Sequence, residues 1–186
     1  MTVQILYKNK DNSNNLVLFV EEGFDINGLK KYISNLEHSY ISDLLKNCDL
    51  KKNLLFFKVN SKKTIFLISI KKNLETSDIE SLGAEFHGYI NYDRKSQYTV
   101  NSDSISSKFE NFIGHFLHGL KLKSYDFNLY KSKIDKKLVL INVIGKKNKF
   151  TIKNELRFNA IEKGTFFARD LVSEPPNVLN PKEYVN

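Results

Sequence analysis

Two of the four histidines in this chain lie at a spacing that suits a metal site. His115 and His118 are three positions apart, so on a helix both imidazoles lie near one face, where Glu110 and Asn111 are the nearby oxygen donors. On a helical wheel, however, His118 lies opposite the apolar stripe and His115 lies beside its edge. We therefore predict two exposed surface histidines rather than a metal centre.

The remaining nucleophilic or ligating side chains are isolated in the sequence. His38 and His87 have no companion ligand, and each is assigned a core or surface role. Cys48 is the only cysteine, so it has neither a disulfide partner nor a second thiol for a metal site. No histidine accompanies it in a catalytic motif, and we interpret it as a semi-buried thiol.

Acid pairs can be drawn, but they do not indicate catalysis. Glu21 with Glu22, and Asp78 with Glu80, have the character of turn and cap residues rather than of a converging dyad. The G-x-S-x-G, H-E-x-x-H, P-loop and G-x-G-x-x-G motifs do not occur. Taken residue by residue, the sequence predicts a folded domain without a visible active site.

Strand and helix patterns alternate along the chain and would have to position any site. Strands are expected at residues 3–7, 16–20, 54–59, 64–70, 98–100 and 138–144. Helical spacing covers 26–36 with a continuation to 45, 77–90, 103–120 and 153–173, whereas 125–130 is compatible with a strand or a turn. The two apolar strands at 54–59 and 64–70 are expected at the sheet centre. This order predicts a three-layer α/β domain, a mixed sheet with helices on both faces.

The C-terminal residues predict a chain that continues. Pro175 and Pro176 end the long helix. Asn180, Pro181 and Glu183 then have the pattern of a new helix, with a cap, a proline at the first position and an acid at the third. Because a helix of about six residues is not stable alone, we expect Asn186 to be a cut end and the helix from residue 153 to be an interdomain linker.

Basic charge is concentrated in one segment. The net charge is +8, and residues 121–153 hold ten lysines against two aspartates. Four of these lysines are candidate nucleic-acid contacts: Lys131, Lys133, Lys136 and Lys137. Only three arginines occur in the chain, and arginine is the better residue for bidentate phosphate and base contacts. We therefore favour a solvated surface and keep DNA binding by residues 121–153 as the alternative.

The start of the sequence and its longest apolar stretch do not suggest export or a membrane segment. The first residues lack the basic start and apolar run of a secretory signal, and the longest apolar stretch, around residues 64–70, is far too short to span a bilayer. These features predict a cytoplasmic protein with no membrane partner.

A family resemblance enters at residues 168–181, which read Ala-Arg-Asp-Leu-Val-Ser-Glu-Pro-Pro-Asn-Val-Leu-Asn-Pro. This stretch resembles the junction of the leucyl aminopeptidase (cytosol aminopeptidase) family, where a helix ending in Ala-Arg-Asp-Leu precedes Glu-Pro-Pro-Asn. Ser124-Tyr125-Asp126-Phe127 with Tyr130-Lys131, and Tyr40-Ile41 with Leu44-Leu45, are similar to further elements of that family. The matches follow the same order along nearly the whole chain.

The resemblance implies an architecture: a macro-like N-terminal domain at 1–150, a linker helix at 151–174 and the start of a truncated C-terminal catalytic domain at 175–186. The implied junction residues are Arg169, Asp170, Glu174, Pro175, Pro176 and Asn177. Where family members have glycine-rich loops, this chain has Lys51-Lys52-Asn53 and Ser69-Ile70-Lys71-Lys72. That difference argues against a stand-alone ADP-ribose binder.

The resemblance also implies an activity for the parent protein. Family members remove N-terminal residues from peptides with two divalent metals, zinc or manganese, which activate a bridging water. Their metal ligands belong to motifs such as Asn-Thr-Asp-Ala-Glu-Gly-Arg, which is absent here. We therefore assign no catalytic, metal or cofactor residue to this chain and expect a supporting role beside its own catalytic domain. The parent is expected to be a homohexamer and this piece a monomer.

Overall fold

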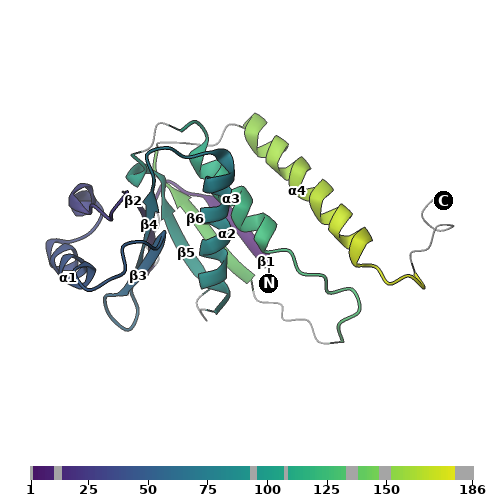
Figure 1. The fold of residues 1–186 in the computed structure, drawn as a ribbon, viewed down its shortest axis with the longest axis horizontal. Helices are drawn as coiled ribbons and strands as arrows, with labels where there is room; N and C mark the ends of the chain where they lie inside the picture. The colour runs from purple at the N-terminus through teal and green to yellow at the C-terminus, as the bar shows by residue number, and fades with distance from the viewer. Residues whose placement is uncertain are drawn as a thin grey trace.

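A six-stranded sheet forms the centre of the computed structural model, which describes residues 2–10, 14–92, 96–106, 109–132, 138–146 and 152–178 (Figure 1). The strands are β1 (Thr2–Tyr7), β2 (Asn15–Glu21), β3 (Leu54–Lys58), β4 (Thr64–Ile70), β5 (Gln97–Asn101) and β6 (Leu138–Ile144). Their order across the sheet is β1-β6-β5-β2-β4-β3. β3 pairs antiparallel with β4, and the other neighbours are parallel. The sheet is therefore mixed, as expected.

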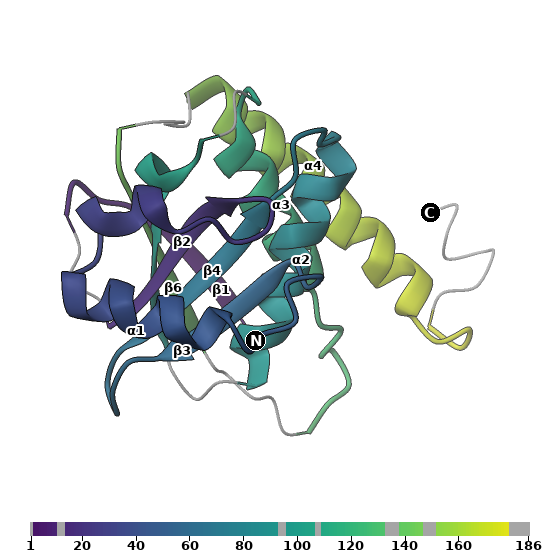
Figure 2. The ribbon, with the colours of Figure 1, turned by 60° about the vertical axis from the view of Figure 1, so that its left-hand side comes forward.

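Helices cover both faces of this sheet (Figure 2). The helical segments are η1 (Asn27–Lys31), α1 (Asn35–Leu45), α2 (Thr76–Tyr92), η2 (Ser102–Ser104), α3 (Phe112–Lys123) and α4 (Ile152–Ser173). Alternate residues of β2 point to opposite sides. Phe19 joins the cluster under α2 and α3, while Leu18 joins the one under η1 and α1. These two clusters confirm the three-layer α/β prediction.

Two predictions about element position were wrong. β3 lies at the edge of the sheet rather than at its centre, because it folds back on β4 and leaves Phe56 exposed. The helical pattern of residues 26–45 is divided into η1 and α1. Ser34 takes an extended conformation between them and caps α1 through a reciprocal pair with Glu37.

The helix expected from residue 103 begins later. η2 occupies Ser102–Ser104, and α3 starts after Asn111, whose φ of 57° is left-handed. The Asn101 side chain accepts the Asp103 N–H and so stabilises the short 3-10 turn instead of a continuing helix. Residues 125–130 form no strand. The helix expected at 153–173 is confirmed as α4, whereas Asn180, Pro181 and Glu183 lie outside the described residues.

The helices α2 and α3 cross at two glycines. A Cβ on Gly83 would overlap the Phe116 carbonyl, and one on Gly119 would overlap the backbone of Glu80. The two backbones therefore touch directly, because neither glycine carries a Cβ. This crossing fixes the position of α3, the helix that receives α4.

The last helix lies outside both core clusters. In Figures 1 and 2, α4 runs beside α3 and extends away from the sheet toward its C-terminal end. Phe158 is buried, yet neither hydrophobic cluster contains a residue of α4. In the described part of the chain, no helix has both the length and the apolar content needed to cross a membrane.

Candidate functional site

The face of α4 that contacts the domain combines polar side chains with the rings of Phe158 and Phe166. Glu162 is buried and accepts a hydrogen bond from Lys121, with Nζ and Oε2 2.9 Å apart. Its other oxygen, Oε1, lies 3.0 Å from Nδ1 of His118, which is only 5% exposed. Asn159 adds a second acceptor for Lys121, at 3.2 Å. A network of four side chains, with Glu162 and His118 buried, therefore joins α3 to α4, and its low-polarity surroundings make each of its bonds depend on the others.

The prediction that His118 is exposed was wrong. The helical wheel correctly placed it away from the sheet, but α4 covers that side of α3. The Phe158 ring lies between the two histidines, with centroids 5.0 Å from His115 and 4.9 Å from His118. His115 turns toward α2, where Nδ1 is 3.2 Å from Glu80 Oε1. The two imidazoles thus belong to two separate histidine–glutamate pairs.

These pairs do not form a metal centre. Among the described residues, no group of three or more histidine, cysteine, aspartate and glutamate side chains is placed to hold a metal ion. Cys48 is half-buried and donates its thiol to the Leu44 carbonyl at 3.3 Å, which confirms its interpretation as a semi-buried thiol. Asp78 accepts the Glu75 N–H at 2.9 Å at the start of α2, as a cap residue does.

A cavity of about 430 Å³ opens beside the buried network, between β1, α3 and α4. Tyr7, Lys121, Glu155, Asn159 and Glu162 contribute its polar lining. Burial raises the pKa of Tyr7 well above its usual range, and the charges of Glu155 and Glu162 raise it further. The phenol is therefore neutral at every physiological pH.

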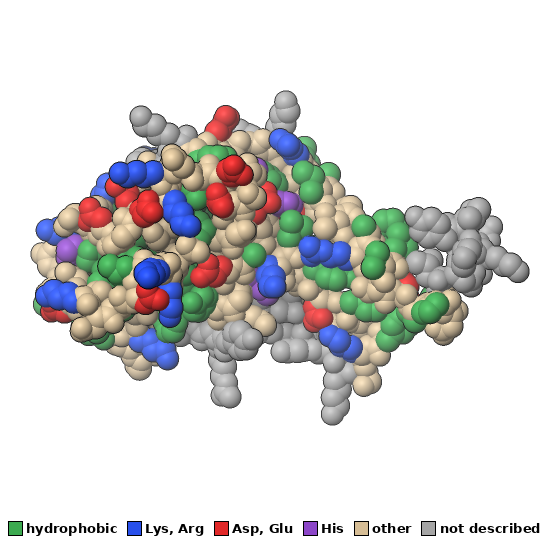
Figure 3. Space-filling model, in the orientation of Figure 1, with side chains coloured by type: hydrophobic (Ala, Val, Ile, Leu, Met, Phe, Trp, Pro, Cys, Tyr) green, Lys and Arg blue, Asp and Glu red, His purple; other side chains and the backbone are tan. Residues whose placement is uncertain are grey.

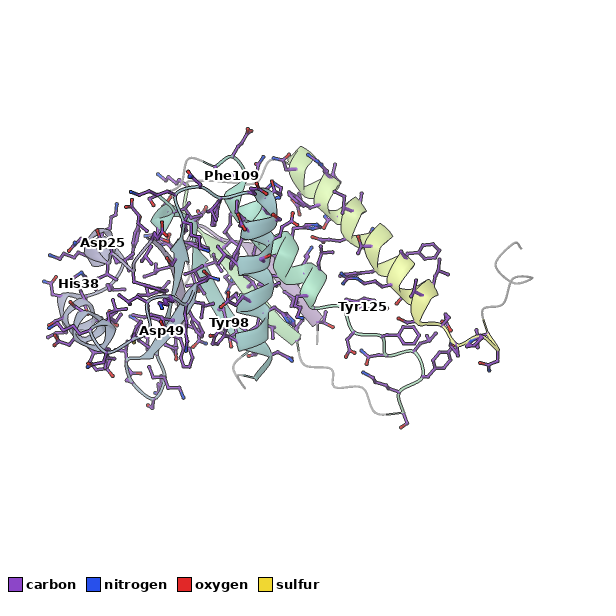
Figure 4. All side chains as sticks on the ribbon, viewed as in Figure 1. Asp25, His38, Asp49, Tyr98, Phe109 and Tyr125 are labelled. Atoms are coloured by element: carbon purple, nitrogen blue, oxygen red, sulfur yellow. The ribbon has the colours of Figure 1, made fainter. Side chains whose placement is uncertain are left out.

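A second set of contacts forms near the C-terminal end of α4. Arg169 donates to the Leu122 carbonyl at 2.6 Å and stacks on the Tyr125 ring, with 5.5 Å between the guanidinium carbon and the ring centroid. The Tyr125 hydroxyl donates to Asp170 at 2.7 Å, and the Tyr130 hydroxyl donates to Glu174. Figure 4 shows Tyr125 on the segment after α3, facing this end of the helix. Arg169, Asp170 and Glu174 therefore clamp residues 124–130 onto α4.

The clamp unites two stretches that carried the family resemblance. The hydrogen bond to Glu174 and partial burial raise the pKa of Tyr130, and partial burial together with the bond to Asp170 raises that of Tyr125. Both tyrosines are therefore stable donors. Pro175, Pro176 and Asn177 follow in a turn in which the Val178 N–H bonds the Pro175 carbonyl at 2.9 Å. That these residues form an interdomain junction stays a prediction.

Two lysines of the basic segment, Lys121 and Lys131, form ion pairs with acidic side chains. Lys131 lies 2.9 Å from Asp126, which lowers the pKa of that carboxyl, and Lys121 is committed to Glu162. Lys133, Lys136 and Lys137 lie outside the described residues. The described lysines thus add no support to DNA binding.

Sequence reasoning missed Glu162, Asn159 and Tyr7. The spacing of Glu155, Asn159 and Glu162 marks one polar stripe on α4. A polar stripe on a helix ordinarily faces solvent. Its true direction could be recognised only from the matching polar residues that α3 presents.

Comparison with known proteins gives partial sequence matches and nearly complete structural ones. The chain is 30% identical over 122 residues, or 60% of its length, to a probable cytosol aminopeptidase of Nitrobacter winogradskyi, of which the match covers 23%. It is 33% identical over 70 residues, or 36% of its length, to the probable cytosol aminopeptidase of Xanthobacter autotrophicus, of which 14% is matched. No family model matches the chain.

Solved structures of similar fold include two aminopeptidases. A mutant of tomato leucine aminopeptidase matches 98% of this chain with a TM-score of 0.71 and 15% identity. The cytosol aminopeptidase from Coxiella burnetii matches 96% with a TM-score of 0.61 and 15% identity. The chain spans 40% and 35% of these two proteins. The chain is therefore similar in sequence, over part of its length, to cytosol aminopeptidases, and its fold matches part of a leucine aminopeptidase over nearly all of this chain.

Proposed function

We propose that the chain is the non-catalytic N-terminal domain of a leucyl-aminopeptidase-type metallopeptidase and that it supports the architecture and assembly of that enzyme. The observation that carries the proposal is the match of 98% of this chain to only 40% of a leucine aminopeptidase. The described residues offer no group of metal ligands, so catalysis is assigned to the part of the relatives that this chain does not match.

The clamp supplies a physical role for this domain. Arg169, Asp170 and Glu174 hold α4 at its C-terminal end, while Glu162 holds its middle. Two separated attachments fix the direction of the helix, because a single one would leave it free to swing. A catalytic domain following α4 would be held at a set distance and angle from the sheet.

The parent enzyme would remove N-terminal residues from peptides, in the cytoplasm, as a homohexamer with two zinc or manganese ions. The names of the relatives support the reaction and the location. A similarly folded bottromycin maturation enzyme, with a TM-score of 0.63 and 12% identity, was solved in complex with manganese, which supports the metal.

The test is to sequence the coding DNA beyond codon 186 and to assay leucine p-nitroanilide hydrolysis. We expect the reading frame to continue into the Asn-Thr-Asp-Ala-Glu-Gly-Arg motif. Residues 1–186 should show no turnover with zinc or manganese, while the continued chain should be active. An immediate stop codon, or turnover by residues 1–186 with stoichiometric metal, would contradict the proposal.

A further inference from the structure

The strand β3 leaves one edge of the sheet open. Among the described strands it is the last in the sheet order, with β4 on one side and no strand on the other. The Val59 N–H donates to the Lys63 carbonyl at 2.9 Å, so in this antiparallel register the odd-numbered residues exchange hydrogen bonds with β4. The N–H and C=O groups of Leu54 and Phe56 therefore point outward. An edge of this kind is a template for one more strand.

On the α2 side of this edge, an aromatic pair is open to solvent. Phe56 is 47% exposed, and its ring lies 5.8 Å from the half-buried ring of Tyr89, centroid to centroid. The buried ring of Phe66 supports Phe56 at 5.9 Å. An incoming side chain can therefore pack on an aromatic surface that is already formed.

On the α1 side, a stripe of exposed apolar residues runs beside the same edge. Leu36, Tyr40 and Leu44 recur every four residues along α1, and Leu36 is 85% exposed. The Tyr40 hydroxyl donates to the Lys58 carbonyl at 3.4 Å, which places this stripe next to the end of β3. Side chains of a strand alternate between the two sides of a sheet. A strand added at β3 therefore meets apolar surface on both sides.

Lysines frame this apolar edge at both of its ends: Lys51, Lys52, Lys58 and Lys62. All four are exposed, and in the described part of the chain none of them forms an ion pair. Residues 49–63 hold five lysines against one aspartate. Figure 3 shows apolar side chains with lysine or arginine side chains among them where Figure 1 places α1 and β3. These charges favour a partner with carboxylates, whereas a second copy of this chain would bring its own lysines against them.

We propose that the edge of β3 binds an extended acidic peptide segment of another protein, which pairs with Leu54 and Phe56 as a seventh strand. This goes beyond the proposed function and does not depend on a catalytic domain. Backbone hydrogen bonds set the register of the added strand. Its central apolar side chains pack on Phe56 and Tyr40, and carboxylates at its two ends meet the lysines.

Fluorescence anisotropy of a labelled peptide, fluorescein-Asp-Glu-Val-Tyr-Val-Glu-Asp, titrated with residues 1–186 measures this binding. We expect a dissociation constant of about 10–100 µM, and weaker binding in about 0.5 M salt because the lysine charges are screened. Lys52→Glu with Lys58→Glu should weaken binding at least about fivefold. Lys10→Glu with Lys163→Glu is the matched control, because these exposed lysines lie after β1, at the opposite edge of the sheet, and on α4. No binding up to about 1 mM, or equal effects of the two double substitutions, would overturn the proposal.

Amide hydrogen exchange distinguishes strand pairing from charge attraction alone. In the free chain, the outward N–H groups of Leu54 and Phe56 should exchange faster than those of Leu55 and Phe57, which face β4. Saturation with the peptide should slow exchange at Phe56 at least about tenfold. Bound peptide that leaves this N–H unprotected would contradict strand addition. Protection that rises with protein concentration in the absence of peptide would identify a second copy as the occupant and would also overturn the proposal.

Discussion

Single carboxylates decide how two helices of this domain are held. Glu37 caps α1, and Glu162 fixes α4 to α3. The Glu37 capping box was not predicted, because the helical spacing of residues 26–45 runs across it, although Ser34 and Glu37 have the three-residue spacing of that motif. The role of Glu162 is not readable, because its partners, His118 and Lys121, are more than 40 residues away.

At Glu37 we predict a pH-dependent loss of stability. Burial alone would raise its pKa, but hydrogen bonds from Lys63 and Ser34 outweigh this and lower the pKa below its usual 4.5. A carboxyl group whose pKa is lower in the folded than in the unfolded protein stabilises the fold at pH values above its unfolded pKa. This contribution is lost as the pH falls through the pKa of the folded protein. Glu37→Gln should cost about 1 kcal/mol at pH 7, and its difference from wild type should shrink below pH 4.5.

Urea unfolding between pH 3 and pH 7 measures this difference. Glu22→Gln, which removes the same charge from an exposed turn, is the control and should follow the wild-type curve. A cost of Glu37→Gln that does not change with pH would contradict the assignment.

At Glu162 we predict that α4 loosens before the sheet does. Replacing Glu162 by Gln removes the charge that Lys121 and His118 share, at a cost of about 1–3 kcal/mol. Amide hydrogen exchange should become faster in α4 and stay unchanged in β4. Glu155→Gln, on an exposed residue of the same helix, should have little effect. Unchanged protection of α4 in Glu162→Gln would show that the network does not attach the helix.

At the scale of elements, local patterns predicted most of the sheet and helices. β4 and β6 are recognised by apolar runs that a single polar residue, Ser69 or Asn142, interrupts, and α4 by its length and by the prolines that follow. β3 is equally apolar, yet it lies at the edge of the sheet, because strand order depends on long-range pairing that no local pattern encodes. The same limit explains His118, whose burial depends on a helix that comes much later in the chain.

The crossing of α2 and α3 gives the element-level prediction. Gly83→Ala or Gly119→Ala would force a methyl group into the backbone of the opposite helix. Each should destabilise the domain by about 1–3 kcal/mol or more. Gly88→Ala, where the space is open, should instead stabilise it by up to about 1 kcal/mol. Thermal unfolding of the three variants measures the contrast, and equal melting temperatures would contradict the described packing.

At the scale of the whole molecule, the sequence predicts a boundary near residue 150, between the sheet with its packed helices and α4. Neither hydrophobic cluster draws a residue from α4. We predict that a chain ended after Lys146 still folds, with a cooperative unfolding transition and a near-ultraviolet circular dichroism spectrum close to that of the full chain. It should lose some stability, because Phe158 no longer covers His115 and His118. If the truncated chain showed no cooperative transition, α4 would have to be counted as part of the core domain.

The pairing of β1 with β6 means that β1 can enter the sheet only late in synthesis. Of the six described strands, β1 leaves the ribosome before the others, but its neighbour in the sheet, β6, follows more than 130 residues later. Until β6 emerges, Thr2–Tyr7 has no strand partner, while β2, β3 and β4 can already pair. Closure of such distant contacts is slow and leaves the waiting strand open to mispairing. The nascent amino end of this domain is therefore the segment for which a ribosome-associated chaperone would matter most.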